Sequence, residues 1–174
     1  MKKNTRNIAI AGVVSTAALA FLYIACVFPY LRFTFIGLAG ILAVVLMIEC
    51  GVRTSVIVFL SVTVLSFVIM PVKQVAVFYL IFLGFYPIFK HFAEKLQPLF
   101  LEWMVKLLYV NAAVLVTYFF LVAALVPDFH LKWPEYIAII AVNAVFVAYD
   151  ISISRIAHFY IKKVRERIGG MDVL

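Results

Sequence analysis

The stretch GFYPIFKHFAEKLQPLFLEWMVK, residues 84–106, decides the fold because it is the one long charged interruption of an almost continuously apolar chain. Three hydrophobic segments precede it, a fourth ends inside it, and two follow it. Its charged residues alternate with Phe, Leu, Trp and Met, a mixture typical of an amphipathic segment that lies among lipid headgroups. The sequence therefore predicts an interfacial segment here, broken at Pro98.

The composition excludes a water-soluble domain. Of the 174 residues, 67% are hydrophobic and only 13% are charged, which is far from the balance of a soluble protein. The net charge of +7 does not indicate nucleic-acid binding, because the basic residues lie at the ends of apolar runs and form no continuous polar surface. Lipid is the expected solvent, and residues 1–174 are expected to form a single transmembrane domain.

A membrane-spanning helix needs roughly 20 apolar residues to cross about 30 Å of hydrocarbon. Six segments qualify or nearly so. They are residues 8–28, 33–50, 54–72, 74–89, 107–126 and 136–154. An amphipathic tail follows at 155–170, where basic side chains can face anionic headgroups. The predicted fold is all-α, a bundle of six transmembrane helices in a multi-pass protein of the cell membrane.

Lys and Arg are distributed unevenly between the two ends of this bundle. With six spans, one end receives all of the 15 Lys and Arg residues except Arg32, Lys73 and Lys132. Short cytoplasmic loops carry the excess of Lys and Arg in membrane proteins. The distribution therefore predicts that both termini lie in the cytoplasm.

The predicted outer turns carry side chains that can close over a small polar ligand. The candidate substrate-binding residues are Tyr30, Arg32, Gln74, His130 and Trp133, together with Asn143 inside the membrane. Solvated loop residues would have a similar composition, so the identity of the ligand stays open.

Polar residues within or at the boundary of the apolar segments form a second set of candidates, because a polar group in lipid is costly and must face protein or water. They are Glu49, Lys90, Lys106, Asn111 and Asp150. The two acids and two lysines near the inner side are expected to neutralise one another across the bundle. The alternative is a proton relay through Asp150.

Helix geometry gives the expected depth of the polar residues on the last two segments. Asn143, Asp150 and Ser154 are separated by seven and four residues, so they share one helical face. Asn143 is expected near the midplane and Asp150 about 10 Å further inward. Asn111 follows Lys106 by five residues and is expected roughly 7 Å from the inner side.

Two helices contain small or helix-breaking residues in positions of interest. The first segment carries Gly12, Thr16 and Ala20 at four-residue spacing, which gives a flat face for close helix contact. That face can pack inside the bundle or dock a separate subunit. The fourth segment contains Gly84 and Pro87, which mark either a bend in a functional helix or its early end.

The sequence contains no HExxH, GxGxxG, Walker A or GxSxG motif, and no cluster of Cys and His with metal-ligand spacing. We therefore expect no enzymatic activity, no catalytic residue, and no bound cofactor or metal. A transport role would then depend on partner subunits for its energy.

In layout, the chain resembles the S-component of energy-coupling factor transporters. The resemblance rests on a basic N-terminus, six helices in 174 residues, and small residues at every fourth position of the first helix. In that family an Ala-x-x-x-Ala pattern contacts the transmembrane coupling subunit, and extracytoplasmic turns bind a vitamin or a metal. Gly12, Thr16 and Ala20 occupy the matching positions here, and the first two depart from alanine.

A second resemblance involves residues 84–111. The sequence GFYPIFK, together with Glu102, Lys106 and Asn111, is similar to small uncharacterised membrane proteins of Firmicutes. This likeness implies no activity.

The first resemblance implies a substrate-binding membrane subunit for uptake of a small, vitamin-like molecule, energised by a coupling subunit and ATPases. The substrate would bind at the outer turns and be released after the first helix and the inner segment dock on the coupling subunit. The alternative is a non-transporting scaffold of a cell-envelope or sporulation complex, similar in size to rod-shape proteins. Neither hypothesis involves nucleic acid.

Overall fold

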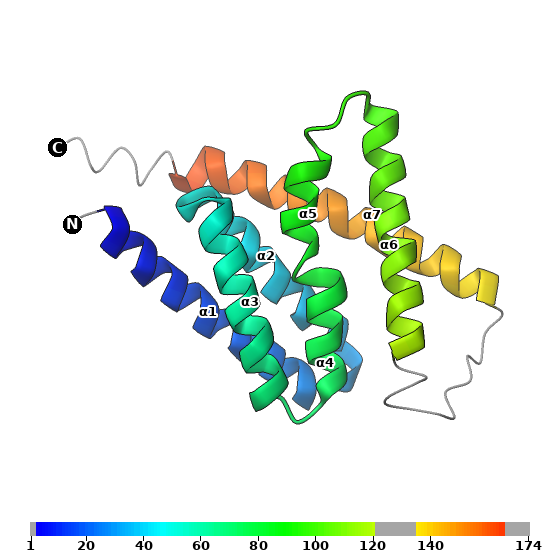
Figure 1. Ribbon diagram of the computed structural model, residues 1–174, viewed down its shortest axis with the longest axis horizontal. Coiled ribbons are helices and arrows are strands. Elements are labelled where there is room, and N and C mark those ends of the chain that lie inside the picture. Colours follow the sequence, from blue (N-terminus) through cyan, green and yellow to red (C-terminus); the bar gives the residue numbers. More distant parts are fainter. Residues whose placement is uncertain (1–2, 121–134, 166–174) are drawn as a thin grey trace.

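A computed structural model describes residues 3–120 and 135–165, and within these ranges every regular element is a helix (Figure 1). The long helices are α1 (Lys3–Val27), α2 (Arg32–Cys50), α3 (Val52–Ile69), α6 (Leu99–Phe120) and α7 (Glu135–Phe159). The short elements are η1 (Pro29–Leu31), α4 (Lys73–Phe78), η2 (Tyr79–Leu83), α5 (Tyr86–Ala93) and η4 (Tyr160–Arg165). Of these, η1 is a 3-10 turn, and η2 and η4 are π-helical.

Six helical stretches in the described part of the chain are long and apolar enough to cross a membrane. They are Thr5–Val27, Pro29–Cys50, Val52–Ile69, Lys73–Ala93, Leu99–Tyr118 and Ile139–Lys163. The chain is a multi-pass membrane protein, and the predicted all-α bundle of six helices is confirmed. The start of α1 and the end of η4 lie at the same end of the bundle (Figure 1). That this end is cytoplasmic stays a prediction.

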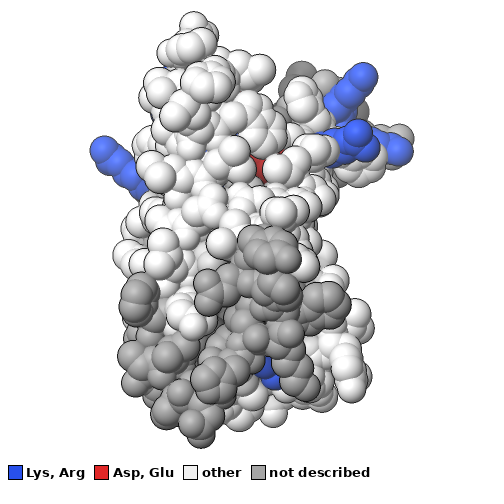
Figure 2. Space-filling view, turned by 90° about the vertical axis from the view of Figure 1, so that its right-hand side faces the viewer, with Lys and Arg blue, Asp and Glu red and all other residues white. Residues whose placement is uncertain are grey.

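Helix α2 is the central element, because it contacts α1, α3, α5 and α7. The larger of two hydrophobic cores surrounds it and includes Leu22 of α1, Ile36 of α2, Val62 of α3 and Val75 of α4. Lipid tails are as apolar as these side chains, so close van der Waals packing holds the helices together. On the face seen in Figure 2, most Lys and Arg side chains project from the upper half, and most of the remaining described surface is uncharged.

The small-residue face of α1 points away from the bundle. Gly12, Thr16 and Ala20 are all exposed, and no atom lies within 4 Å of a Cβ built on Gly12. Helix α1 instead buries Val14 and Ala18, which lie two residues further along. A shift of two residues is about 200° around a helix, so the two faces are nearly opposite. Of the two alternatives for this face, packing inside the bundle is therefore wrong, and docking of a separate subunit stays a prediction.

The interfacial segment predicted before residue 107 is also wrong in part. Helix α5 ends at Ala93, and α6 begins at Leu99, so residues 99–106 form the first two turns of a membrane-spanning helix. Lys106, which was expected at the headgroup boundary, is only 2% exposed at its side chain. Its burial is tolerated because carboxylates surround its ammonium group, as described below. Helix α7 likewise continues past residue 154 to Phe159.

The fourth span is interrupted at Gly84 and Phe85 and then continues as α5. Gly84 and Pro87 therefore mark a break within this helix and not its early end. The amide of Gly84 donates to the carbonyl of Tyr79 at 2.8 Å, a π-helical bond across five residues, and α5 starts again at Tyr86. Pro87 has no N–H to donate to the carbonyl of Leu83 four residues earlier. The hydroxyl of Tyr149 on α7 lies 3.2 Å from that carbonyl and supplies the missing donor. Neighbouring helices commonly satisfy backbone groups freed in this way.

Candidate functional site

Five charged side chains from three helices meet where the fourth span restarts. This ion cluster consists of Lys90 on α5, Glu94 at the C-cap of α5, Glu102 and Lys106 on α6, and Asp150 on α7. Asp150 joins the two lysines, because Lys90 pairs with its Oδ1 and Lys106 lies 3.3 Å from its Oδ2. The cluster therefore ties α5, α6 and α7 together through one carboxylate.

The two glutamates complete the pairing of the lysines. The Nζ of Lys90 lies 3.1 Å from Oε1 of Glu94, and the Nζ of Lys106 lies 2.6 Å from Oε1 of Glu102. Glu94 Oε1 also lies 3.8 Å from Lys106. Each lysine thus has a carboxylate four residues away on its own helix and a second one on α7, which offsets much of the cost of burying it.

The centre of the ion cluster is shielded from solvent and lipid. The side chains of Lys90 and Asp150 are only 6% and 5% exposed. The hydroxyl of Tyr86 donates to Oδ1 of Asp150 at 2.5 Å. Asp150 therefore accepts hydrogen bonds from three side chains, and such a fully paired network is strong in a low-dielectric interior.

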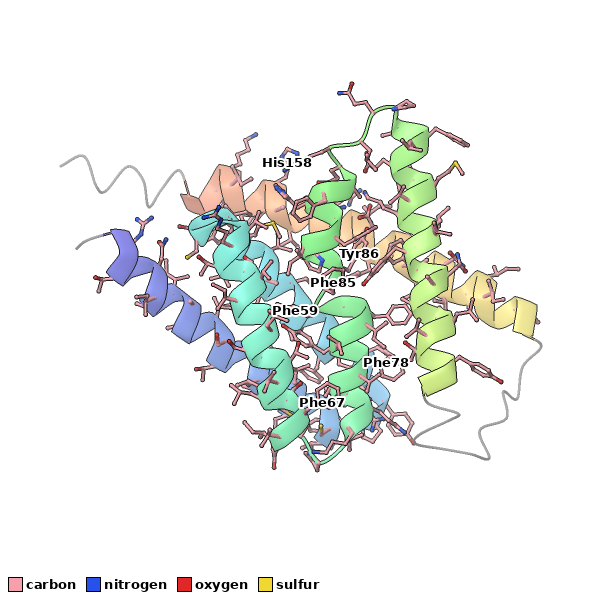
Figure 3. The ribbon with its side chains drawn as sticks, in the orientation of Figure 1. Phe59, Phe67, Phe78, Phe85, Tyr86 and His158 are labelled. Atoms are coloured by element: carbon pink, nitrogen blue, oxygen red, sulfur yellow. The ribbon has the colours of Figure 1, made fainter. Side chains whose placement is uncertain are left out.

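Aromatic rings pack beside this network. The ring of Tyr86, whose hydroxyl bonds to Asp150, is buried and packs edge-on against Phe146 at 4.7 Å between centroids. Phe89 stacks on Tyr109 at 4.4 Å, and the ring of Tyr109 lies 5.8 Å from that of Tyr86. Figure 3 shows Phe85 and Tyr86 at the restart of the interrupted helix. Burial of the Tyr86 ring beside Asp150 lowers the local dielectric and so strengthens the electrostatic interactions of this carboxylate.

The structure brings together three of the four charged residues that were expected to neutralise one another. Lys90, Lys106 and Asp150 meet as predicted. Glu49 does not join them, and its Oε1 instead accepts a hydrogen bond from the hydroxyl of Tyr160 at 3.2 Å. Helix α2 carries Glu49 on its last turn, where the η4 turn covers it rather than α5.

Glu94 and Glu102 belong to the ion cluster, although the sequence pattern did not predict that they would pair with Lys90 and Lys106. Both were assigned to an interfacial segment and so were expected to face water. A usable signal was present, because Glu94 follows Lys90 by four residues and Lys106 follows Glu102 by four. Oppositely charged residues at this spacing are neighbours on one face of a helix.

Asn111 and Asn143 form a separate polar contact between α6 and α7. Their side-chain amides exchange two hydrogen bonds, of 3.3 and 3.2 Å. The sequence placed Asn111 near the inner side and Asn143 near the midplane. Because α6 begins at Leu99, Asn111 lies about 18 Å along its helix, at the level of Asn143. The side chain of Asn143, a candidate for substrate binding, is thus hydrogen-bonded to Asn111 of α6.

The amide pair gives the first testable prediction, a coupling energy between Asn111 and Asn143. We expect the double-mutant cycle to give about 0.6 to 2 kcal/mol, the range for polar contacts between membrane helices. The cycle compares Asn111→Ala, Asn143→Ala and the double variant by reversible unfolding in mixed micelles. Ser152→Ala is the matched control, since the hydroxyl of Ser152 donates to the carbonyl of Ala148 on its own helix at 2.7 Å and has no other hydrogen bond within residues 3–120 and 135–165. Coupling of Asn111 to Ser152 as large as that to Asn143 would contradict the pairing.

The candidate ligand residues at the opposite end of the bundle are only partly brought together. Nη1 of Arg32 donates to Oε1 of Gln74 at 3.3 Å, which joins the starts of α2 and α4. Tyr30 is fully exposed and does not take part in this contact. His130 and Trp133 lie outside the described residues. Ligand binding at these turns stays a prediction.

A cavity of about 450 Å³ lies between α2, α5 and α7, beside the ion cluster. Its polar lining residues are Lys90, His91, Glu94, Ser154 and His158. The rest of the wall is mainly apolar and includes Met47, Pro87 and Ile153. Figure 3 shows His158 near the end of α7, so the cavity lies toward the end of the bundle that carries the start of α1. Its volume and mixed lining suit a small molecule.

No protein-family model, curated protein or solved structure matches this chain. The function is therefore inferred from the geometry and charge of the site.

The site stabilises buried charged side chains by pairing lysines with carboxylates. Among the described residues, no group of three His, Cys, Asp or Glu side chains is arranged to hold a metal ion. The chemistry available is ion pairing and hydrogen bonding, and it is concentrated where an interrupted helix meets α7. Ionisable groups inside a membrane protein commonly mark the path of a substrate or an ion.

Proposed function

We propose that this chain is the substrate-binding membrane subunit of a small-molecule uptake transporter, energised by partner subunits. The observation that carries the proposal is the interrupted fourth span. It provides part of the wall of the 450 Å³ cavity and places Lys90 against Asp150 of α7. Transporters often bind substrates beside broken helices, because the break leaves polar groups and a hinge at membrane depth.

The interruption also supports movement of α5. The break at residues 84–85 offers a hinge between η2 and α5. Ile88 of α5 packs in the same hydrophobic core as α4 and η2, so a tilt of α5 would pivot about that contact. Toward α6 and α7, α5 combines the ion pairs of Lys90 and Glu94 with the packing of Tyr86 in the second core. A tilt of α5 would therefore exchange charge partners within the ion cluster.

Dependence on partners is supported by two features of the chain. It contains no Walker A motif, so ATP binding would be supplied by another subunit. The face formed by Gly12, Thr16 and Ala20 is exposed among the described residues and would allow close approach of a helix from a coupling subunit.

Purification from native-type bacterial membranes tests the proposal through both its ligand and its partners. We expect mass spectrometry of the purified protein to detect a small molecule that is lost in Ala157→Phe, because a phenyl ring on this lining residue fills the cavity. We also expect ATPase subunits to co-purify, and Gly12→Leu to remove them because it adds bulk to the docking face.

Ser61→Leu is the matched control for the docking variant. Ser61 is an exposed small residue on α3, so the same added bulk is placed on a different lipid-facing helix. Loss of ATPase subunits in both variants would mean that bulk alone disturbs assembly. Co-purification of cell-envelope proteins without ATPases or a small molecule would replace transport with the scaffold hypothesis.

A further inference from the structure

The ion cluster carries more acid than base. Lys90 and Lys106 provide two ammonium groups, whereas Glu94, Glu102 and Asp150 provide three carboxylates. When all five groups are ionised, one negative charge is left over in a region where the dielectric is low. This local excess is opposite to the net charge of +7 for the whole chain. An unbalanced charge at this depth favours a counter-charge from outside the cluster.

The excess negative charge is accessible at one residue. Glu94 is 45% exposed at its side chain, compared with 14% for Glu102 and 5% for Asp150. Glu94 also lines the cavity, whereas Glu102 and Asp150 do not. In the described part of the chain Glu94 pairs with Lys90 and Lys106 through Oε1, at 3.1 and 3.8 Å, and its exposed carboxylate can take a further partner through Oε2.

Among the described residues that line the cavity, Lys90 is the one Lys or Arg, and it is paired with Asp150 and Glu94. Lys95, two residues after α5, and Lys163 in η4 lie outside the lining. The ammonium group of Lys95 lies over the ring of Phe92, and that of Lys163 lies over the ring of Phe159. His91 and His158 can accept hydrogen bonds in their neutral form. The apolar wall formed by α2 and α7 suits a hydrocarbon or aromatic body.

We propose that this cavity binds a small organic monocation, with its ammonium group on Glu94 and its apolar body between α2 and α7. The proposal names the ligand class of the cavity and rests on the proposed function only in taking this cavity as the substrate site. A small carboxylate would meet the excess negative charge of the ion cluster, and a neutral molecule would leave Glu94 Oε2 without a charged partner.

Three probes of matched size test the charge preference directly. Benzylammonium, benzyl alcohol and benzoate are offered separately to the full-length protein in lipid nanodiscs at neutral pH, and retention is measured by equilibrium dialysis. Empty nanodiscs of the same lipid provide the blank for partition into the bilayer. We expect benzylammonium to bind about tenfold or more tightly than benzoate, with benzyl alcohol between them. Only the amine forms an ion pair with Glu94, the alcohol can donate one hydrogen bond to the carboxylate, and benzoate is repelled by it.

Three carboxylate variants and one cavity-filling variant locate the site. Glu94→Gln removes the charge inside the cavity and is expected to weaken benzylammonium binding by about tenfold. Glu102→Gln removes the same charge from the ion cluster outside the cavity, and binding is expected to stay within about threefold because the distance to the ligand is larger. Glu94→Asp retains the charge and is expected to restore most of the affinity. Ala157→Phe is expected to lower the binding of all three probes.

The preference among the probes is measured on the unmodified protein, so the test does not depend on whether a variant folds. Equal retention of the three probes, including no retention above the blank, would overturn the proposal. An equal loss in Glu94→Gln and Glu102→Gln would overturn it as well. These measurements use the protein without partners, so amine binding in a chain that recruits no ATPase would uphold the ligand class while contradicting the transport function.

Discussion

Asp150→Asn is expected to lower the free energy of unfolding by about 3–5 kcal/mol, the largest effect of any single substitution considered. The substitution keeps the size of the side chain but removes the negative charge that Lys90 and Lys106 share on α7. Lys90 then retains only Glu94 as an ion-pair partner among the described residues, and Lys106 retains Glu102 and the longer contact with Glu94. The ion pairs that join α7 to α5 and α6 are lost together. Reversible unfolding in mixed micelles, followed by circular dichroism, measures the loss.

Two comparisons make this prediction specific to the ion cluster. Glu49→Gln is the matched control, since Glu49 is also a boundary carboxylate but accepts from the neutral hydroxyl of Tyr160. We expect Glu49→Gln to lower the free energy of unfolding by about 1 kcal/mol, the contribution of an ordinary hydrogen bond. In the cycle with Lys90→Met, the double variant is expected to be more stable than the sum of the single effects predicts. Strict additivity would mean that Lys90 and Asp150 do not act as a pair.

Gly40→Ala is expected to destabilise the protein by about 3 kcal/mol, because the added methyl group would overlap a backbone atom. A Cβ on Gly40 would overlap the carbonyl oxygen of Leu83 and lie 2.6 Å from the hydroxyl of Tyr149. Neither can move freely, since Leu83 belongs to the π-helical η2 and Tyr149 supplies the donor for its carbonyl. The variant therefore displaces the interrupted helix from α2.

Gly37→Ala provides the control for this effect on the same helix. Its nearest neighbour would be a ring carbon of Tyr149 at 3.6 Å, an ordinary van der Waals contact. Because alanine favours a helix over glycine by up to about 1 kcal/mol, we expect this variant to be neutral or slightly stabilised. The same unfolding assay compares the two. Equal stability of the two variants would show that α2 and the interrupted helix do not meet at Gly40.

The candidate site could be predicted only in part. A lysine or aspartate in an apolar run must find a partner, so Lys90, Lys106 and Asp150 were predicted to pair. The same rule applied to Glu49 gave a wrong partner, because it states that a charge needs a counter-charge without stating which one. The ion pairs of Glu94 and Glu102 were not predicted, because the charged residues around them indicated a segment at the membrane surface, where carboxylates need no buried partner.

The amino-acid pattern was enough to predict a lipid environment, six membrane-spanning helices, and the polar groups that need partners. These predictions follow from the length of apolar runs and from the cost of placing charge in hydrocarbon, both local properties of the chain. Which face of α1 is exposed, where the fourth span breaks and which charges meet could be learned from the folded arrangement alone. Those outcomes depend on how each helix is rotated about its axis. That rotation is set by contacts between distant residues, such as Gly40 and Leu83, which no local pattern records.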